Sequence, residues 1–267
     1  MNATQKKTNY TLITGASSGI GKALAVECAT RGQNLFLIDL PGTGLPKLST
    51  SLSELYGVHT CILETDLSRY DAHQEIFGYV ISQNISVNIL INNVGSGHNG
   101  NLENTDDIKI TSMILLNMNT TTLLCKVFLP MLKENSRSFI LNVCSLAAFT
   151  PLPGKSVYAA SKAFVLFFSK ALNAELSQSG VSVSAVFPAG VPTNDLVKKR
   201  ISQSSRIAKF LVTDAELVAR RAIEGMFRRK EIIFPGKRIK AIFYASSFVP
   251  QGLVLRFMSG EFKRAPK

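Results

Sequence analysis

Residues 10–21 read YTLITGASSGIG, an apolar run that leads directly into Gly15, Gly19 and Gly21. A helical pattern follows over Ile20–Arg31. Glycines let the backbone turn tightly and approach a pyrophosphate closely, and the amino end of a helix supplies unpaired N–H groups and a positive dipole end. Glycines also make ordinary turns, but their place between an apolar run and a helix favours a dinucleotide site. The spacing is G-x-x-x-G-x-G, which differs from the commonest G-x-G-x-x-G fingerprint.

The same alternation of short apolar runs and longer helical patterns continues along the chain. Runs that are apolar throughout suit strands covered on both faces of a sheet. We expect strands at Tyr10–Thr14, Asn34–Asp39, Thr60–Glu64, Val87–Ile91, Ser138–Val143 and Val181–Phe187. We expect helices at Ile20–Arg31, Leu45–Tyr56, Asp71–Gln83, Asp106–Glu134 (with a break) and Ser156–Gln178. This order predicts an α/β protein with a doubly wound parallel sheet, the three-layer α/β/α Rossmann fold.

The formal net charge of +12 is concentrated at one end of the chain. Residues 1–196 carry 13 basic and 13 acidic side chains, whereas residues 197–267 carry 17 basic and 5 acidic ones. A chain that is basic throughout would suggest a nucleic-acid partner. A neutral body with one basic end, and with no recognised nucleic-acid-binding module, predicts no such partner.

The cysteines and histidines form no metal-binding or disulfide pattern. Cys28, Cys61, Cys125 and Cys144 stand far apart, and the three histidines have no ligand spacing. The polar segment Met1–Asn9 lacks the apolar stretch of a signal peptide. These features predict reduced thiols, no metal and a cytoplasmic protein.

Asp39 ends the second predicted strand, twenty-four residues after Gly15. A carboxylate at this place can accept hydrogen bonds from the adenosine ribose hydroxyls, and it repels a 2′-phosphate. No lysine or arginine occupies Ser17, Ser18 or Leu40, where a phosphate would need a partner. The sequence therefore favours NAD over NADP as the cofactor and leaves NADP open. The alternative for Asp39 is a solvated carboxylate at the start of a turn.

Tyr158 and Lys162 can together exchange a proton. They are four residues apart, so both project from one face of a helix. A free phenol holds its proton too tightly for efficient exchange at neutral pH, and a fixed ammonium beside it favours the phenolate. Ser145, thirteen residues before Tyr158, can hold a substrate oxygen and stabilise charge that develops there. Tyrosine and lysine at this spacing are common on any helix, and Ser145 also suits a turn, so only the combination with the glycine turn predicts catalysis.

These residues, in this order, resemble the short-chain dehydrogenase/reductase family over about Tyr10 to Leu196. Further positions that match are Thr65-Asp66-Leu67, Asn92-Asn93-Val94-Gly95 (where the family has Asn-Asn-Ala-Gly), Asn117, and Pro188-Ala189-Gly190 with Thr193. The resemblance implies an enzyme that moves a hydride between a nicotinamide cofactor and a carbonyl or alcohol carbon, with Tyr158 as general acid or base. It also implies that Lys162 reaches the nicotinamide ribose and that Asn117 links Lys162 to solvent through a bound water.

Two sets of site residues follow from this reading. The catalytic set is Asn117, Ser145, Tyr158 and Lys162. The cofactor-binding set is Gly15, Ser17, Ser18, Gly19, Ile20, Gly21, Asp39, Asp66, Leu67, Asn93, Gly95, Tyr158, Lys162, Pro188, Gly190, Val191 and Thr193.

We predict one domain, with residues 1–196 as the dinucleotide-binding and catalytic core and residues 197–267 as a substrate lid and basic C-terminal helical extension. The apolar residues Phe149, Leu152, Val157 and Val191 suit a hydrophobic small-molecule substrate (a ketone, 3-oxoacyl or steroid-like compound), although they also suit a core. The resemblance further implies a homodimer or homotetramer that pairs the helices at Asp106–Glu134 and Ser156–Gln178.

The basic end leaves several readings open. Lys198, Lys199, Arg200, Arg206 and Lys209 fall where the family has its mobile lid, so they could meet an acidic substrate group such as a carboxylate, or the phosphopantetheine of an acyl carrier. Arg228-Arg229-Lys230 and Lys237-Arg238-Ile239-Lys240 flank apolar residues, and an apolar stretch interrupted by Pro250 and Arg256 follows up to Met258. This mixture suits peripheral contact with an anionic membrane. A solvated basic face is the plainer interpretation. A peripheral membrane lipid-metabolising reductase and a non-catalytic NAD(H)-binding regulatory protein both stay open as alternatives, although the four catalytic residues argue against the second.

Overall fold

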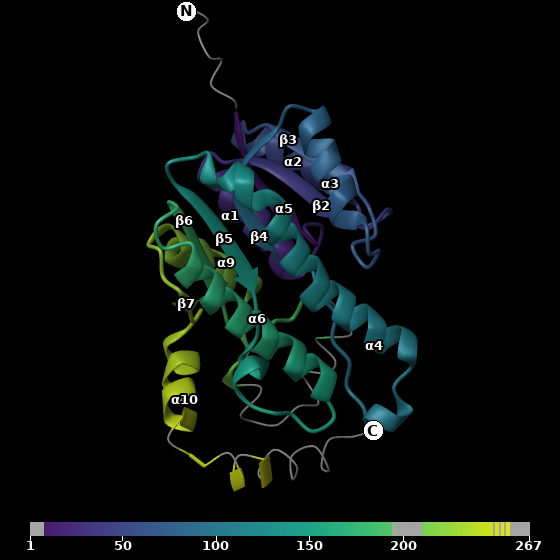
Figure 1. Ribbon diagram of the computed structural model, residues 1–267, viewed down its shortest axis with the longest axis vertical. Helices are drawn as coiled ribbons and strands as arrows, with labels where there is room; N and C mark the ends of the chain where they lie inside the picture. Colours follow the sequence, from purple (N-terminus) through teal and green to yellow (C-terminus); the bar gives the residue numbers. More distant parts are fainter. Residues whose placement is uncertain are drawn as a thin grey trace, which may run out of the picture.

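The computed structural model describes residues 8–193, 197, 210–247, 249–250, 252–253 and 255–256. Over these residues the chain forms a seven-stranded sheet in the order β3-β2-β1-β4-β5-β6-β7 (Figure 1). Its strands are β1 (Asn9–Thr14), β2 (Asn34–Asp39), β3 (Thr60–Glu64), β4 (Ser86–Asn92), β5 (Ser138–Val143), β6 (Val181–Val186) and β7 (Ile232–Ile233). All neighbouring strands are parallel. The strand order reverses between β1 and β4, and such a reversal opens a crevice at the carboxyl ends of the strands.

The six predicted strands are confirmed, with ends that shift by at most one residue. Their side chains are apolar on both faces because both faces are covered: every residue of β5 and β6 is buried. The seventh strand, β7, was not predicted, because two isoleucines are too short a run to indicate a strand. Ile232 and Ile233 pair with Ala185 and Val186 of β6.

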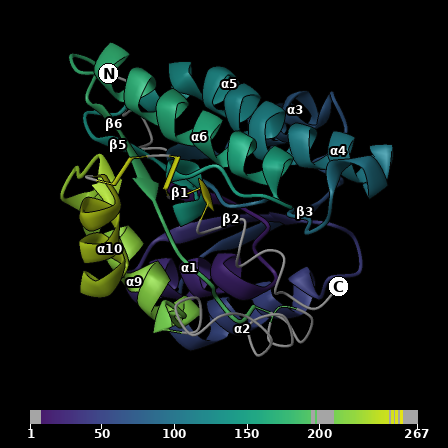
Figure 2. The same cartoon turned by 90° about the horizontal axis from the view of Figure 1, so that it is seen from below.

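Helices cover both faces of the sheet and make three layers (Figure 2). One face carries α1 (Gly19–Thr30), α2 (Leu45–Tyr56) and α9 (Ala215–Phe227), and the other carries α3 (Ala72–Ser82), α5 (Thr121–Lys133) and α6 (Ser156–Glu175). A hydrophobic core fills the space between the sheet and each helix layer. Leu24 and Ile223 are fully buried in one core, and Ile76 and Phe128 in the other. The predicted single-domain Rossmann architecture is confirmed.

The long helix predicted over Asp106–Glu134 is continuous through α4 (Asp107–Ile114), η2 (Leu115–Thr120) and α5, so the break expected in it is absent. A π-helical segment, η2, lies in its middle instead. Among the described residues, Asp107–Lys133 is the one helix long and apolar enough to cross a membrane. Leu124, Phe128 and Leu132 on its inner face are fully buried against the sheet. The core accounts for the apolar residues on this inner face of the helix.

The C-terminal quarter adds to the body of the domain. Val218 and Ala222 of α9 are fully buried in the same core as α1, and β7 extends the sheet. α10 (Lys237–Ser247) then packs beyond β7 (Figure 1). The predicted lid residues Lys198, Lys199, Arg200, Arg206 and Lys209 lie outside the described residues.

The four cysteines are free thiols, as their spacing predicts. Cys28, Cys125 and Cys144 are buried, and Cys61 is half-buried. No group of histidine, cysteine, aspartate or glutamate side chains in the described part of the chain could hold a metal ion.

Candidate active site

The glycine turn connects the carboxyl end of β1 to the amino end of α1. Gly15 and Gly19 have φ angles of +64° and +51°, in the left-handed region that favours glycine. A Cβ on Gly21 would lie 1.8 Å from the carbonyl oxygen of Gly15, so no other residue fits there. Ser18, the residue before α1, makes no side-chain capping hydrogen bond with the helix. The amino end of α1 therefore keeps its N–H groups for an anion, and the bare backbone fits the pyrophosphate of a dinucleotide.

Asn93 ties this turn to the loop after β4. Its Nδ2 donates to the carbonyl oxygens of Thr14, at 2.9 Å, and Gly15, at 3.0 Å. In return the Thr14 hydroxyl oxygen accepts hydrogen bonds from the backbone N–H groups of Asn93 and Val94. Asn93 was predicted to bind the cofactor, and the structure shows it fixing the glycine turn.

Asp39 lies at the carboxyl end of β2, as predicted, and faces the glycine turn. Its Oδ2 accepts hydrogen bonds from the backbone N–H of Ser17, at 2.8 Å, and from the Ser17 hydroxyl. Its Oδ1 accepts from the N–H of Leu40 at 2.8 Å. These bonds fix a negative charge beside the turn, and a carboxylate has lone pairs left for further donors.

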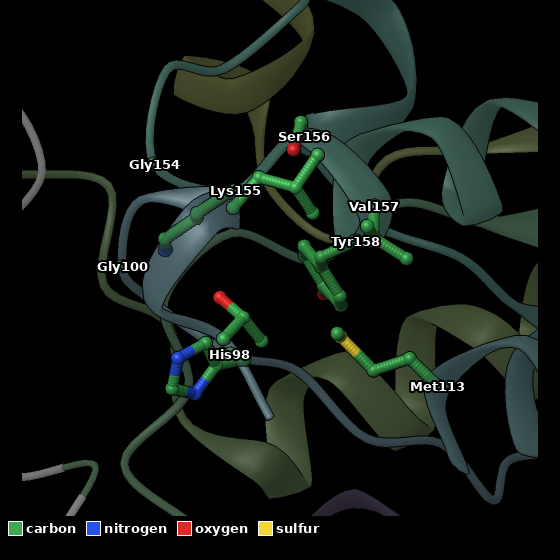
Figure 3. Close-up of a pocket in the computed structure, with 10 residues that line it drawn as sticks. His98, Gly100, Met113, Gly154, Lys155, Ser156, Val157 and Tyr158 are labelled. Carbon is green, nitrogen blue, oxygen red and sulfur yellow. The ribbon is translucent and has the colours of Figure 1, made fainter. Parts of the chain in front are cut away.

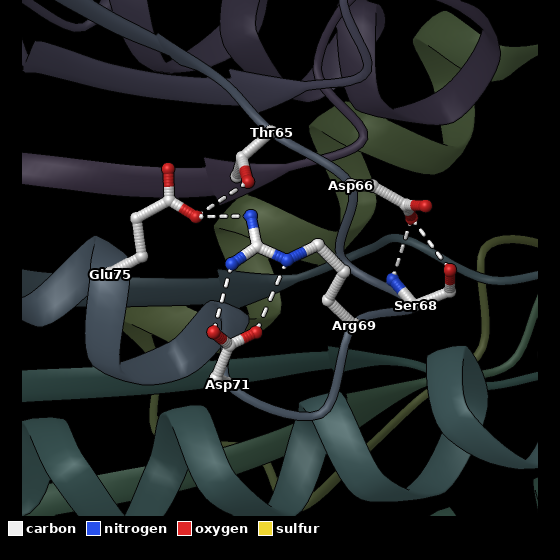
Figure 4. A network of polar contacts seen from close by, with 6 residues as sticks. All are labelled: Thr65, Asp66, Ser68, Arg69, Asp71 and Glu75. Carbon is white, nitrogen blue, oxygen red and sulfur yellow. Dashed lines mark hydrogen bonds and ion pairs between the residues drawn. The ribbon is translucent and has the colours of Figure 1, made fainter.

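The loop after β3 is held by two small polar networks (Figure 4). In one, Asp66 Oδ1 accepts from the N–H of Ser68 at 2.8 Å and from its hydroxyl at 2.7 Å. In the other, Arg69 donates to Asp71 at 2.9 Å and to Glu75 at 3.0 Å. The Arg69 guanidinium holds the pKa of the Asp71 carboxyl below its ordinary value. Asp66 is therefore fixed at the carboxyl end of β3, where its contact with a cofactor stays a prediction.

Tyr158 and Lys162 lie on one face of α6, as their spacing predicts. The Lys162 Nζ atom is 6.0 Å from the centroid of the Tyr158 ring and donates to the carbonyl oxygen of Val143 at 3.0 Å. Lys162 is only 6% exposed, so its ammonium is held at the carboxyl end of β5. Next to it, burial raises the pKa of the Cys144 thiol to about 11, and the nearby Lys162 charge opposes that rise. The thiol stays protonated at neutral pH.

Ser145 follows Cys144 and begins the short helix η3 (Leu146–Phe149). Its hydroxyl oxygen accepts a hydrogen bond from the N–H of Ala147 at 3.2 Å. The hydroxyl thus serves the turn that was considered as the plainer interpretation, while its proton can still be donated to another oxygen.

Asn117 is buried inside η2 and fastens that helix to two other parts of the site. Its Oδ1 accepts from the N–H of Ser96 at 2.9 Å, and its Nδ2 donates to the carbonyl oxygen of Ser96 at 3.0 Å. The same Nδ2 donates to the Ser161 hydroxyl at 2.9 Å, which in turn donates to the carbonyl oxygen of Tyr158 at 2.8 Å. A π-helical segment at this place is typical of a functional site. The relay from Lys162 to water stays a prediction.

Two glycines let the loop after β4 pass close to these side chains. A Cβ on Gly95 would lie 2.7 Å from Asn117 Oδ1 and 3.4 Å from Lys162 Nζ. A Cβ on Gly97 would lie 3.1 Å from Cδ2 of the Tyr158 ring. The tyrosine, the lysine and the asparagine therefore meet at the same loop that Asn93 ties to the glycine turn.

Sequence reasoning missed three residues of this arrangement: Ser96, Gly97 and Ser161. The local signal for Ser161 was its place directly before Lys162, and that for Gly97 was a second glycine two residues after Gly95. Neither signal shows that the residue contacts a catalytic side chain, because that contact depends on folding.

The segment after β6 returns to the same crevice. The carbonyl oxygen of Pro188 accepts from the N–H of Leu146 in η3 at 3.0 Å. Further along, the Thr193 side chain lies so close to Gly19 that a Cβ there would be 2.6 Å from Thr193 Cγ2. The segment thus connects the Ser145 helix to the glycine turn.

The remaining predicted residues lie around this centre. Leu67 and Val191 are buried in the core, at 3% and 6% exposed, so their side chains serve packing. Ile20 is half-buried beside that core, and the carbonyl oxygen of Gly190 accepts from the N–H of Thr213 at 3.0 Å.

A small pocket of about 220 Å³, part of it open to solvent, lies beside Tyr158 (Figure 3). Its walls come from the loop after β4, from α4 and from the start of α6, and consist of His98, Gly100, Leu102, Thr105, Met113, Gly154, Lys155, Ser156, Val157 and Tyr158. Val157 lines this pocket. Phe149 instead packs against the Phe187 and Phe243 rings.

The fold and this site define a dinucleotide-binding α/β protein in which a tyrosine–lysine pair faces the crevice at the carboxyl end of the sheet. Residues 9–204 match the family model of the short chain dehydrogenases. The chain belongs to the short chain dehydrogenase family.

Known proteins of this family resemble the chain over most of its length. It is 34% identical over 189 residues to very-long-chain 3-oxoacyl-CoA reductase from Anas platyrhynchos. The matched region covers 69% of this chain and 60% of that protein. The chain thus spans about 60% of the length of the curated relatives that it matches first.

Two solved structures extend the comparison. A short-chain dehydrogenase from Sphingobium yanoikuyae in complex with NADPH shares 33% identity, with a TM-score of 0.78 and coverage of 93% of this chain and 95% of that one. The bulky-bulky ketone specific alcohol dehydrogenase from Comamonas testosteroni shares 30% identity, with a TM-score of 0.74 and coverage of 93% and 96%. These similarities support a nicotinamide dinucleotide as the cofactor class.

Proposed function

We propose that the protein is an NAD-dependent oxidoreductase that moves a hydride between NAD(H) and the carbonyl or alcohol carbon of a hydrophobic substrate. The observation that carries this proposal is the placement of Tyr158 and Lys162. Both side chains lie against the loop of Gly95 and Gly97, next to the glycine turn that fits a pyrophosphate. When bound, the nicotinamide ring supplies or accepts the hydride.

Three side chains of the protein would carry out proton transfer, cofactor binding and charge stabilisation. Tyr158 gives a proton to the substrate oxygen in ketone reduction and removes one in alcohol oxidation. The Lys162 ammonium, fixed by the Val143 carbonyl, lies 6.0 Å from the centroid of the Tyr158 ring and has N–H groups left for a ribose hydroxyl. Ser145 donates its hydroxyl proton to the substrate oxygen and stabilises developing charge.

Asp39 supports NAD rather than NADP within this proposal. Its carboxylate is fixed beside the glycine turn by Ser17 and Leu40, where it can accept from ribose hydroxyls and repel a 2′-phosphate. A solved relative of 33% identity is in complex with NADPH, so the choice between the two cofactors is the part of this proposal that needs a direct measurement.

The substrate class we propose is a ketone on a long or bulky apolar group, with a 3-oxoacyl thioester as the first candidate. The names of the relatives refer to 3-oxoacyl-CoA and to bulky ketones. The pocket beside Tyr158 has apolar walls from Leu102, Met113 and Val157 and polar ones from His98, Thr105 and Ser156, so the proposed class rests on the relatives. We also propose a cytoplasmic, reducing location, which the four free thiols support.

The test of this function is the Tyr158→Phe variant, assayed with NADH and 3-oxoacyl-CoA substrates of several chain lengths. We expect kcat to fall by about 10² to 10⁴, the usual contribution of a general acid, while calorimetry shows unchanged NAD(H) binding. Tyr56→Phe, on the exposed surface of α2, is the matched control and should keep full activity. Full turnover by Tyr158→Phe would remove the residue from the mechanism.

The same assay distinguishes an enzyme from a regulatory protein. If the wild-type protein binds NADH but oxidises none of it across a panel of ketones, the fold serves as a cofactor sensor and the proposed activity is wrong.

A further inference from the structure

One side of α10 is fixed to the body of the protein by an aromatic cluster. The Phe243 ring lies 4.3 Å from the ring of Phe149 and 4.9 Å from that of Phe234, measured between centroids. On the same side, Ile239 is only 2% exposed. These contacts decide which side of α10 faces outward.

The outward side combines positive charge with apolar surface. Lys237, Lys240, Ala241 and Tyr244 are all exposed, and their spacing of three and four residues places them in one stripe along the helix. Tyr244 is 52% exposed, and the Lys240 Nζ atom lies 5.9 Å from its ring centroid. An aromatic ring beside an ammonium suits the boundary between water and lipid.

The described residues that follow α10 also combine exposed apolar side chains with positive charge. Val249 and Leu253 are 42% and 56% exposed, and Arg256 is exposed. Residues 232–260 contain no aspartate or glutamate. The local charge is therefore positive throughout, and no carboxylate of this stretch neutralises it.

This side of the molecule is close to the site described above. Phe149, which holds α10, belongs to η3, and that helix begins directly after Ser145. Figure 1 shows α10 beyond the end of the sheet at which α6 begins.

We infer that Lys237, Lys240, Tyr244, Val249, Leu253 and Arg256 form a docking surface for a bilayer that contains anionic phospholipid. The cations would meet lipid phosphates, and the three apolar side chains would enter the boundary between headgroups and acyl chains. A nucleic acid or an acidic protein would use the cations but would leave Val249 and Leu253 in water, which is why lipid fits better. This inference concerns surface chemistry and does not depend on the proposed catalysis.

The first experiment is co-sedimentation of the full chain with two kinds of vesicle, one of phosphatidylcholine alone and one with about a third phosphatidylserine. We expect binding to the second kind only, with an affinity that falls as salt rises. Lys237→Glu with Lys240→Glu should weaken binding by at least roughly twentyfold, because each lysine contributes about fivefold near an anionic surface. Lys47→Glu with Arg220→Glu, two exposed cations on α2 and α9, is the matched control and should bind vesicles far more strongly.

Equal binding of the two vesicle kinds, or equal binding by the two double variants, would overturn the inference. Calorimetric NAD(H) binding and the thermal midpoint should be unchanged in all variants, so loss of fold is recognised separately from loss of docking.

The second experiment tests the apolar part and the choice of partner. Tyr244→Ser with Leu253→Ser should weaken vesicle binding by about tenfold or more, because both side chains lose apolar surface to bury in the bilayer. Unchanged binding would show that charge alone acts, and the proposed surface would then be wrong. Retention on heparin or RNA without any vesicle binding would assign the cations to a soluble polyanion and overturn the lipid proposal.

Discussion

At the scale of single residues, we propose Asp39 as the side chain on which cofactor choice depends. Its carboxylate is held by Ser17 and Leu40 beside the glycine turn, where the proposed function puts the 2′ position of the adenosine ribose, at which the two nicotinamide cofactors differ. A negative charge fixed there attracts donors and repels a phosphate.

We therefore predict that Asp39→Ser raises kcat/KM with NADPH relative to NADH by roughly tenfold or more, because it removes a repulsion of about 1–3 kcal/mol. Steady-state kinetics with both cofactors measure the ratio. Glu54→Gln, an exposed carboxylate on α2, is the control for net charge and should leave the ratio unchanged. A wild-type enzyme that already prefers NADPH would show that the assignment to NAD is wrong.

Gly97 is the second residue at which we predict the effect of a substitution, because its backbone lies against the Tyr158 ring. The residue has no left-handed φ, so alanine fits its backbone, but the new Cβ would lie 3.1 Å from the ring and displace it. Gly97→Ala should lower kcat by roughly ten- to a hundredfold, since small misplacements of a catalytic group have effects of this size. The pH profile of kcat should shift, while NAD(H) binding stays within about twofold.

Gly78→Ala is the control for this substitution. Gly78 lies within α3, and nothing is within 4 Å of the place where its Cβ would be. Alanine there should keep full activity and add about 0.5–1 kcal/mol of stability. If Gly97→Ala behaves like Gly78→Ala, the glycine does not position the tyrosine.

At the scale of elements, the π-helical segment η2 joins three parts of the site. The Asn117 side-chain amide, which projects from η2, forms hydrogen bonds with the backbone of Ser96, in the loop after β4, and with the Ser161 hydroxyl, in α6. An ordinary α-helix would turn by a different amount at this point, so the position of Asn117 depends on the extra residue that a π-helical turn contains.

Asn117→Ala should lower stability by about 1 kcal/mol, because the substitution leaves partly buried backbone groups of Ser96 without their partners. It should also lower kcat by more than about tenfold, because the loop that touches Tyr158 and Lys162 loses its anchor. Thermal melting and kinetics check the two effects. Asn119→Ala is the matched control from the same helix: Asn119 is half-buried and should tolerate the change. Equal losses in both variants would assign the effect to helix stability alone.

At the scale of the whole molecule, the layer of α4, α5 and α6 leaves large apolar side chains in water. Phe167 on α6 is 70% exposed, and Ile108 on α4 is 77% exposed. Leu55 on α2 is exposed to the same degree, so exposure alone does not assign a subunit surface, and the pairing rests on the family resemblance of these helices. We propose that two copies of the chain pair through this layer.

Phe167→Glu should then shift the mass measured by light scattering towards the monomer, with a dissociation constant raised by roughly a hundredfold, because a charge would be buried without a partner. Leu55→Glu places the same charge on α2, where Leu55 is 74% exposed, and should leave the mass unchanged. A wild-type protein that runs as a monomer would contradict the pairing.

The sequence by itself determined the fold and most of the polar residues at the crevice. Buried parallel strands need apolar residues on both faces, and a helix that packs on a sheet repeats its apolar residues about every 3.6 positions. Both patterns can therefore be recognised in the sequence alone. The glycine turn was legible for a similar reason, because Gly15 and Gly19 adopt backbone angles that other residues rarely reach. The strand ends then placed Asp39 and Ser145 at one edge of the sheet.

The tertiary structure alone decided which distant residues touch. Ser161 holds Asn117 across forty-four positions of sequence, and Gly97 lies against Tyr158 only because the loop after β4 crosses the start of α6. The same holds for β7 and for the outward side of α10, which the Phe149–Phe243 contact fixes. The spacing of apolar residues in a sequence indicates which faces of one helix or strand are buried. These contacts depend instead on how several elements pack against each other, and the spacing within one element does not contain that information.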